Sequence, residues 1–317
     1  MQTQMRQRLT EQFLNYTKTA LQASLLDEVY ATPKPGLVDL HDSGAHTDMD
    51  FRTFEASTGA IVPFLTEMAA MGTSSSETEE HLFSAIRPVG IQAEAAMFEA
   101  TKGVNTHKGM IFSMGLIAAA VGRNFSRQLS LHETLNSEME RSFSLQGEEI
   151  LSLVKEMCAG PLEADFAAIS HDAPRTHGEK LFVTYGCRGI RGEAARGFPA
   201  VSGLTLPRLR KEALRHDLSE PTCWNRVRLL ILLELMSQVE DTNILYRTDY
   251  QSLLYAKKCA SDILSADPSL TENGIGMMQE LNRDFINRRI SPGGCADLLA
   301  ITLFLWRMER FIIYEKE

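Results

Sequence analysis

The chain has 317 residues, of which 44% are hydrophobic and 23% are charged, and its 32 basic and 41 acidic residues give a net charge of −9. This composition is typical of a soluble globular protein with a sizeable core. The acidic balance argues against a general nucleic-acid or anionic-membrane surface, although a few local cations can still bind a small anion.

The five cysteines are widely spaced and form no Cys-x-x-Cys pair, so the sequence predicts neither a zinc knuckle nor a disulfide framework. Scattered thiols fit a reducing compartment. Residues 1–10 lack the apolar core of a signal peptide, and the apolar run 110–121 is too short to span a bilayer. We therefore expect a cytoplasmic protein without a membrane segment.

Apolar residues recur at helical spacing along almost the whole chain. The first helix is predicted to carry Phe13, Leu21 and Val29 and to end near residues 32–36, before a loop that runs to Asp50. Further helices are expected from residue 51, at 82–100, 109–122, 132–158, 200–215, 223–239, 249–265 and 275–287, and from Ser291.

Alternating patterns typical of strands are nearly absent, and residues 181–185 are the only short candidate. The start of the last helix is marked by Ser291 as N-cap and Pro292 in the first turn. We predict an all-α protein in which residues 1–317 form one catalytic domain.

Polar clusters that contain glycine or border a helix end occur at five places, namely residues 33–39, 103–109, 189–193, 241–243 and 291–294. Helix ends expose backbone N–H groups and carry a partial charge, and they can therefore bind a small charged ligand. We expect these distant loops to converge on one such ligand.

Residues 44–50 read Gly-Ala-His-Thr-Asp-Met-Asp. In an extended segment His46, Asp48 and Asp50 would point the same way. That arrangement suits a Mg²⁺ site or an acid–base pair. Capping of the next helix by Asp48 or Asp50 is an equally good interpretation.

The cluster at 103–109 places Asn105, Thr106, His107 and Lys108 between two glycines, directly before an apolar helix. A lysine at a helix N-terminus is unfavourable unless an anion is present, so the pattern predicts a phosphate site. It is not a Walker A loop, because that motif needs Gly before the Lys and Ser or Thr after it. A glycine-closed turn with a solvated lysine is the alternative.

The later clusters are less specific. Glycines spaced by three residues frame Arg191 and Glu193, which suits either close approach to a ligand or a surface ion pair. Asp241 and Asn243 follow a very apolar helix and offer oxygen ligands for a hard cation, or a helix stop. Residues 291–294, followed by Asp297, fit a well-capped helix, although the paired glycines would also allow close approach of a ligand.

Taken together, these segments resemble the triphosphoribosyl-dephospho-CoA synthase family. The resemblance rests on Pro-Lys-Pro-Gly-Leu-Val-Asp at 33–39, Gly-Ala-His-Thr-Asp-Met at 44–49, Gly-Val-Asn-Thr-His-Lys-Gly at 103–109, Arg-Gly-Glu-Ala at 191–194, Asp-Thr-Asn at 241–243 and Ser-Pro-Gly-Gly at 291–294. The segments occur in the family's order, and the resemblance extends over residues 20–306.

The resemblance implies an unusual reaction. The 2′-hydroxyl of 3′-dephospho-CoA attacks C1 of the ribose of ATP, adenine leaves, and the triphosphate stays on the product. Inversion at C1 requires a base near the hydroxyl and an acid near adenine, on opposite faces. The product is the prosthetic-group precursor of the acyl carrier protein of citrate lyase or malonate decarboxylase, and it passes to a separate transferase that modifies that protein.

The resemblance also implies roles for individual residues. Glu193 or His107 is expected to act as the base, and Asp50 to assist catalysis at the ribose. A Mg²⁺ cofactor is assigned to His46, Asp48 and Asp241. Binding of ATP and its phosphates is assigned to Lys34, Gly36, Asn105, Thr106, Lys108, Gly109, Arg191, Gly192, Arg247, Gly293 and Gly294.

A second interpretation is a metal-dependent nucleotide hydrolase, in which His46, Asp48 and Asp241 bind a metal that activates water. A coenzyme-binding protein without catalytic activity is a more distant third.

Overall fold

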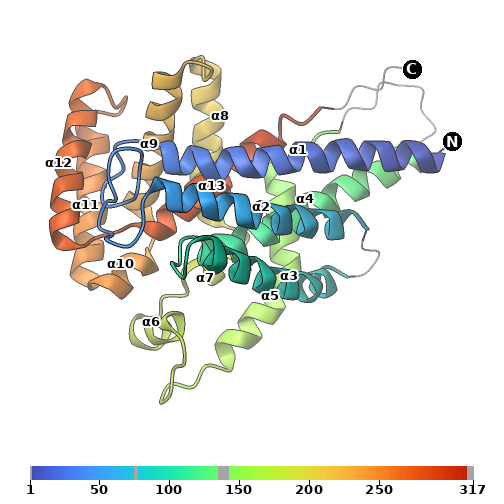
Figure 1. Ribbon diagram of the computed structural model, residues 1–317, viewed down its shortest axis with the longest axis horizontal. Helices are drawn as coiled ribbons and strands as arrows, with labels where there is room; N and C mark the ends of the chain where they lie inside the picture. Colours follow the sequence, from blue (N-terminus) through green and yellow to red (C-terminus); the bar gives the residue numbers. More distant parts are fainter. Residues whose placement is uncertain (1, 75–77, 135–142, 313–317) are drawn as a thin grey trace.

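A computed structural model describes residues 2–74, 78–134 and 143–312. Within these ranges the secondary structure is α-helical apart from one π-helical turn, with no strand, which confirms the predicted all-α class (Figure 1). The elements are α1 (Gln2–Tyr30), α2 (Phe51–Ser74), α3 (Glu79–Ala100), α4 (Lys108–Thr134), α5 (Gly147–Ala167), α6 (His177–Tyr185), α7 (Gly189–Ala195), η1 (Val201–Thr205), α8 (Leu206–Arg215), α9 (Pro221–Gln238), α10 (Thr242–Arg247), α11 (Tyr250–Ala266), α12 (Glu272–Arg288) and α13 (Gly293–Met308).

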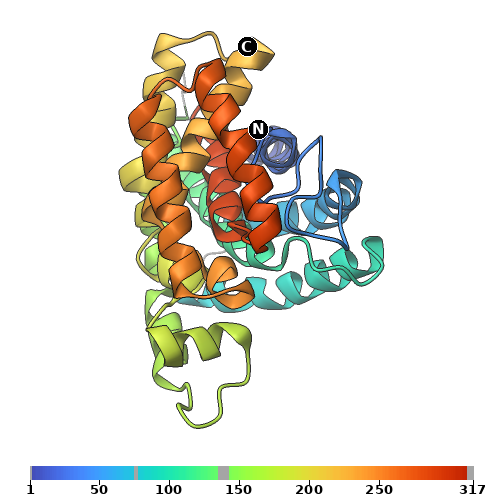
Figure 2. The same ribbon diagram turned by 90° about the vertical axis from the view of Figure 1, so that its left-hand side faces the viewer.

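The last helix, α13, forms the centre of the core. Every residue from Leu298 to Leu305 is buried, and a helix that is apolar on all sides is stable only when other elements surround it. It packs against α1, α4, α8 and α9. In two perpendicular views these helices surround the α13 ribbon, with α11 and α12 to one side (Figures 1 and 2). The N-terminus of α13 therefore reaches the place where several helix ends meet.

Helices α2 and α4 lie unusually close together. A Cβ atom on Gly122 would collide with the carbonyl oxygen of Ala69, and one on Gly72 would collide with that of Ala119. The two glycines let the backbones approach to a distance that no larger residue permits. This contact fixes α4, and with it the loop that precedes Lys108.

The loop of residues 31–50 is anchored by Gly36. Its φ of +70° is a left-handed conformation, its N–H donates to Asn282 Oδ1 over 2.8 Å, and a Cβ there would collide with the carbonyl of Ile290. Gly36 therefore has a packing role and lines neither of the cavities described below, so its position does not support the expected contact with ATP. The anchor brings residues 46–48 beside the start of α13.

Three short segments differ from the sequence prediction. Residues 181–185 belong to α6, because Thr176 Oγ1 accepts a hydrogen bond from Glu179 N and Gly186 ends the helix at φ +71°. A five-residue apolar run is too short to distinguish a strand from a helix. The glycine-rich segment 189–195 is also a helix, α7. Asp241 caps the start of α10 and does not mark only a helix stop.

Two predicted helix boundaries were wrong as well. The helix expected at 109–122 continues to Thr134, and the one expected at 132–158 begins only at Gly147. Residues 135–142 of that prediction lie outside the described ranges. The segment expected as a helix at 200–215 consists of the π-helical turn η1 followed by α8.

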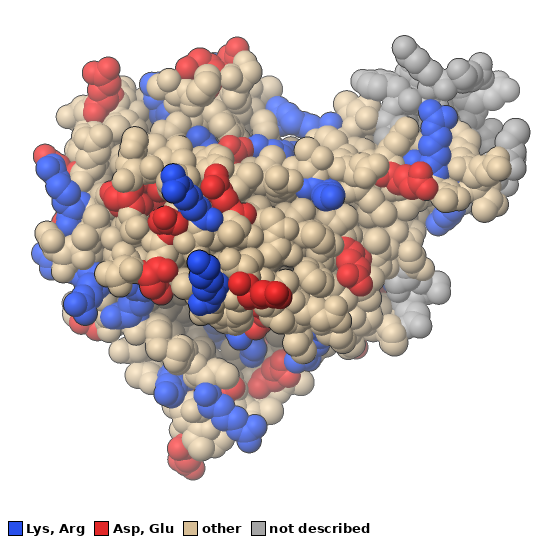
Figure 3. All heavy atoms as spheres, in the orientation of Figure 1, with Lys and Arg blue, Asp and Glu red and all other residues tan. Residues whose placement is uncertain are grey.

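The surface bears both signs of charge. On the face shown in Figure 3, Lys and Arg side chains are interspersed with Asp and Glu, and no broad basic patch is present. Among the described residues, no helix combines the length and apolar character needed to cross a bilayer.

Candidate functional site

Two cavities adjoin where helix ends meet around the start of α13. The large cavity has a volume of about 890 Å³ and the small cavity about 390 Å³, both within the usual range for small-molecule sites. Gly109, Asn243 and Asp297 line both cavities and therefore mark their junction. The predicted convergence of distant loops is thus present, although not all of the predicted residues take part.

The lining comes from segments that are far apart in the sequence. Besides the junction residues, the large cavity is lined by Gly186, Arg188, Gly189, Ile190, Glu193, Arg196, Pro199, Ala200, Gly203, Leu204, Gln238, Val239, Glu240, Asp241, Thr242, Lys257, Gly294 and Leu298. The small cavity is lined by Glu28, Lys34, Leu37, Val38, His46, Asp48, Met49, Phe54, Asn105, Thr106, His107, Lys108, Met110, His177, Tyr246, Arg247, Ser291, Gly293 and Ala296.

Cationic side chains gather at the small cavity. Lys108 is 58% exposed, and its ammonium lies 2.8 Å from Glu94 Oε2. Arg247 is held by a 2.6 Å hydrogen bond from Nη2 to the carbonyl oxygen of Ala45, and its Nη1 lies 3.5 Å from His46 Nδ1. The amino end of α4 opens onto the same space. Cations beside a helix N-terminus form a suitable site for phosphate.

Lys34 differs from the expected free phosphate ligand. Its side chain is only 1% exposed and its ammonium is paired with the buried carboxylate of Glu28. Burial raises the pKa of Glu28, and the positive charge of Lys34 opposes that shift. The structure therefore shows Lys34 as one half of a buried ion pair at the wall of the small cavity.

The loop before α4 is held by side-chain hydrogen bonds. Asn105 Oδ1 accepts from Lys108 N over 3.3 Å, and Thr106 Oγ1 donates to Ser57 Oγ over 2.7 Å. Ser57 Oγ lies 2.6 Å from His107 Nδ1. The tautomer of His107 sets the direction of this hydrogen bond, because Ser57 Oγ can accept from Nδ1–H or donate to an unprotonated Nδ1.

The environment of His107 does not suit a base. The residue is 3% exposed, and burial followed by the charge of Lys34 lowers its pKa to about 3. A general base works best when its pKa lies near the operating pH. At neutral pH His107 is therefore an uncharged imidazole in the wall of the small cavity, and the expectation of a basic role for it is not supported.

The three residues predicted to bind Mg²⁺ are not brought together. His46 and Asp48 line the small cavity, with His46 Nδ1 4.0 Å from Asp48 Oδ1. Burial and then Arg247 lower the pKa of His46 to about 4. Asp241 lies at the large cavity, where Oδ1 accepts from Asn243 N (2.8 Å) and Oδ2 from Cys295 N (2.8 Å).

The carboxylate of Asp241 thus serves as a helix cap and as a link to α13, and only 1% of the residue is exposed. Over the described ranges, no group of three or more His, Cys, Asp or Glu residues is placed to hold a metal ion. The predicted three-residue set does not fit a bound metal.

Asp50 lies outside both cavities. Its Oδ1 accepts from Thr53 N (2.9 Å) and from Thr53 Oγ1 (2.8 Å), and these hydrogen bonds lower its pKa. The residue caps α2, which confirms the capping alternative, and its position gives no support to the predicted catalytic role. Residues 46–50 do not form an extended strand, and their acidic side chains therefore do not share one direction.

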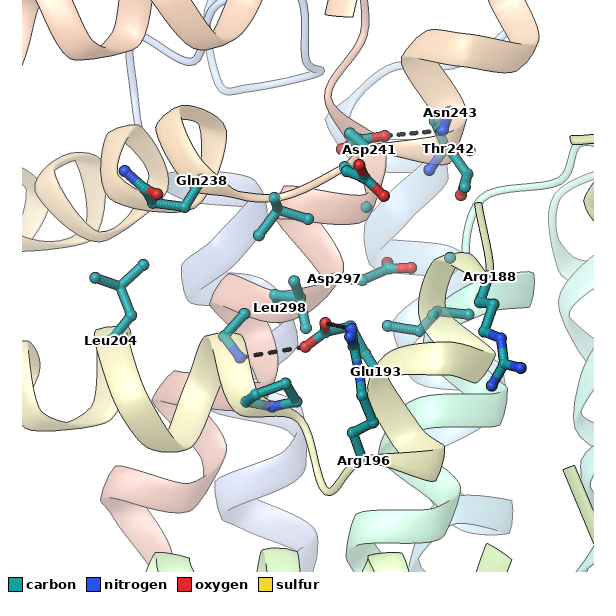
Figure 4. A pocket seen from close by; sticks show the side chains of 18 of the residues that line it. Arg188, Glu193, Arg196, Leu204, Gln238, Asp241, Thr242, Asn243, Asp297 and Leu298 are labelled. Atoms are coloured by element: carbon teal, nitrogen blue, oxygen red, sulfur yellow. Dashed lines mark hydrogen bonds and ion pairs between the residues drawn. The ribbon is translucent and has the colours of Figure 1, made fainter. Parts of the chain in front are cut away.

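Helix α7 presents Glu193 to the large cavity. Its Oε1 lies 2.8 Å from Arg196 Nη2, and its Oε2 accepts from Ala200 N over 3.2 Å (Figure 4). Arg191 is exposed and lines neither cavity, so its predicted phosphate contact is not supported. Arg188, one helical turn earlier, lines the large cavity in its place.

The remaining glycines allow close approach of the chain to itself. Gly192 is buried, and a Cβ there would collide with the side chain of Arg188. A Cβ on Gly293 would lie 3.0 Å from Asn243 Nδ2, and one on Gly294 would lie 3.1 Å from Asp241 Oδ2. Gly293 and Gly294 therefore let the start of α13 pack closely against the start of α10 at the edge of the cavities.

Two acids that line the cavities were given no role from the sequence: Asp297 at the junction and Glu28 in the wall of the small cavity. Glu28 lies near the end of α1, and Asp297 lies about one turn into α13. Glu28 belongs to no recognised motif, whereas Asp297 follows the Ser-Pro-Gly-Gly segment, which was interpreted as a capped helix. The available signal for Asp297 was an acidic residue inside the most apolar helix, where an unpaired charge is costly.

Comparison with known proteins identifies close relatives. A family described as ATP:dephospho-CoA triphosphoribosyl transferase matches residues 15–314. A Streptococcus mutans protein named probable 2-(5″-triphosphoribosyl)-3′-dephosphocoenzyme-A synthase is 38% identical over 293 residues, which cover 91% of this chain and 95% of that protein.

Proteins of the same name in two other organisms are similarly related. The one from Photobacterium profundum is 39% identical, covering 90% of this chain and 85% of its own. The one from Streptococcus equi subsp. zooepidemicus is 40% identical, and the match covers 94% of this chain and 97% of that protein. No solved structure matches the chain significantly.

Proposed function

This chain belongs to the ATP:dephospho-CoA triphosphoribosyl transferase family, and we propose that its two adjoining cavities hold the two substrates of that reaction. The small cavity binds the triphosphate of ATP, and the large cavity binds 3′-dephospho-CoA. The enzyme is a transferase, and neither the family nor the relatives support the alternative of a metal-dependent nucleotide hydrolase.

The position of the cations supports ATP in the small cavity. Lys108, Arg247 and the first turn of α4 face the same space, within a protein whose net charge is −9. Local cations and backbone N–H groups can bind a triphosphate in spite of the overall charge. Asn105, Thr106 and Gly109 shape that turn, and Gly293 lies opposite it.

The size and chemistry of the large cavity support dephospho-CoA. Arg188 and Lys257 offer positive charges for a pyrophosphate, while Leu204 and Leu298 offer apolar surface for a pantetheine arm. The cavity meets the small one at three shared residues. Each substrate can therefore approach the other without crossing the protein core.

Glu193 is the best-placed base for this reaction. It lies in the cavity assigned to dephospho-CoA, so its carboxylate can accept the proton of the attacking 2′-hydroxyl. Arg196 and the N–H of Ala200 hold the carboxylate in place. In this assignment Lys34 and Glu28 form the wall of the donor site.

A Mg²⁺ ion is proposed to accompany ATP, bound mainly by phosphate oxygens, with Asp48 at the wall of the small cavity as a protein ligand. When bound, it would neutralise phosphate charge.

We also propose one catalytic domain, because Glu28 of α1 and Asp297 of α13 line the same cavity. The product is proposed to pass, in the cytoplasm, to a transferase that modifies the acyl carrier protein of citrate lyase or malonate decarboxylase.

The overall proposal is tested by incubating the protein with ATP, Mg²⁺ and 3′-dephospho-CoA and separating the products chromatographically. We expect adenine and the triphosphoribosyl product in equal amounts, and neither when dephospho-CoA is omitted. Release of adenine or phosphate from ATP alone would indicate hydrolysis, and no turnover with both substrates would contradict the proposal.

A further inference from the structure

Asp297 occupies the junction of the two cavities. It is one of the three residues that line both, together with Gly109 and Asn243. In the close view its side chain extends from α13 into the cavity, and no dashed line joins it to a neighbour (Figure 4). A group in this position can contact the reacting ends of both substrates.

Asp297 differs from the other acids around the cavities because it has no partner. Within the described part of the chain, none of the hydrogen bonds or ion pairs involves its carboxyl group. Glu28 is paired with Lys34, and Glu193 with Arg196. Asp297 is half-buried and its carboxyl group opens into the cavities. A carboxylate that is partly removed from water and has no partner is costly, so the neutral, protonated form of Asp297 is favoured.

The position of the carboxyl group depends on Gly109. A Cβ atom at residue 109 would lie 2.6 Å from Asp297 Oδ2, which is closer than van der Waals contact allows. The first turn of α4 and the carboxyl group therefore touch, and only glycine leaves room for Asp297 to point into the junction.

The charges around Asp297 also favour the protonated form of its carboxyl group. Burial raises its pKa well above the usual range, and the negative charges of Glu28 on α1 and Asp241 before α10 raise it further. Lys34 faces the same region but is paired with Glu28, and Lys108 is paired with Glu94. The amino end of α4 acts in the opposite direction, because a helix N-terminus favours negative charge.

We propose that Asp297 is the general acid that protonates the departing adenine. In this step the N9–C1′ bond of ATP breaks and its electron pair leaves with adenine, which receives the proton of Asp297 on a ring nitrogen. The 2′-oxygen of dephospho-CoA forms the new bond to C1′, and its proton passes to Glu193. Water returns one proton from Glu193 to Asp297 after the products leave.

This assignment rests on the proposed function and divides the two acids by role. Glu193, with a cationic partner in the acceptor cavity, accepts a proton. Asp297, unpaired and touching the donor cavity, supplies one. A pair of carboxyl groups in contrasting environments is the usual arrangement for acid–base catalysis at a glycosidic carbon.

The test compares the wild type with Asp297→Asn, using ATP and 7-methyl-ATP as donors and dephospho-CoA as acceptor. With ATP, we expect kcat to fall about 10²–10⁴-fold, the usual contribution of general acid catalysis, with little change in the Kd of ATP. The purine of 7-methyl-ATP already carries a positive charge and leaves without a proton. With that donor we expect most of the loss to disappear.

The pH profile gives a second readout. The wild-type kcat is expected to decline at high pH, where Asp297 loses its proton, and this decline should be missing in Asp297→Asn. Thermal unfolding of the variant serves as the folding control. Because the substitution is isosteric and removes an unpaired acid, we expect an unchanged or higher Tm.

The outcomes separate this inference from the proposed function. If the wild type releases no adenine from ATP and dephospho-CoA, the proposed function fails. If the wild type is active but Asp297→Asn is equally active, or loses the same factor with both donors, only the role of Asp297 fails. If neither protein uses 7-methyl-ATP, retention of the high-pH decline in the variant overturns the assignment.

Discussion

Replacing Glu193 with glutamine is expected to lower kcat about 10²–10⁴-fold, which is the range found when a positioned general base is removed. Glutamine has nearly the same shape but cannot accept the proton of the 2′-hydroxyl. Its amide oxygen can still accept the hydrogen bond from Ala200 N that Glu193 Oε2 accepts now. The loss should therefore appear in kcat, measured by adenine release, with little effect on the Kd of either substrate.

Glu240→Gln is the matched control for that experiment. Glu240 also lines the large cavity, but it lies beside Cys187, with 3.7 Å between its Oε2 and the sulfur, and no role in the reaction is assigned to it. This variant should keep kcat within a few-fold of the wild type. Equal losses in both variants would indicate a general effect of charge in the cavity, and normal turnover of Glu193→Gln would remove Glu193 as the base.

Replacing Lys108 with alanine is expected to lower turnover about 10²–10³-fold, equivalent to about 2.7–4 kcal/mol, by analogy with the loss of one preorganised electrostatic donor. The ammonium lies beside the first turn of α4, where the triphosphate is proposed to bind. Its pairing with Glu94 is largely solvent-exposed, so the fold should lose little stability. Steady-state kinetics with varied ATP measures the effect.

Lys258→Ala is the matched control variant for Lys108→Ala. Lys258 is 73% exposed and is paired with Asp262 on α11, and it lines neither cavity. This variant should retain wild-type kinetics. Near-normal kinetics in Lys108→Ala would exclude Lys108 from the site and would argue against the small cavity as the triphosphate site.

The helical architecture could be predicted because local patterns determine it. Apolar spacing identified the long helices, and the Ser-Pro-Gly-Gly segment marked the start of α13. The prediction failed for α6, α7 and α10, which have nine, seven and six residues. Helices this short depend on caps such as Thr176 and Asp241 and on tertiary packing more than on a repeating pattern.

The site could be predicted only in part, because a sequence motif does not give the direction of a side chain. His46, Lys108, Glu193 and Arg247 all line the cavities, as a converging set of loops requires. Arg191 lies only two residues from Glu193 but faces away, since neighbours at that spacing on a helix point in different directions.

Two acids that were assigned to the site from the sequence cap helices instead. Asp50 and Asp241 resemble catalytic or metal-binding acids in the sequence, yet hydrogen bonds to nearby N–H groups occupy their carboxylates. Asp297 has no such partner, and the Ser-Pro-Gly-Gly segment before it could be explained by helix capping alone. An unpaired acid can be recognised only when the surrounding helices are in place.

The most direct measurement is a structure of the Asp297→Asn enzyme with ATP and 3′-dephospho-CoA bound together. We expect the triphosphate beside Lys108 and Arg247, and the acceptor 2′-oxygen about 3–3.5 Å from C1′ of ATP. The amide of residue 297 should face adenine, with Glu193 beside the hydroxyl. Both substrates in one cavity, or a C1′ atom remote from residue 297, would contradict a reaction at the junction.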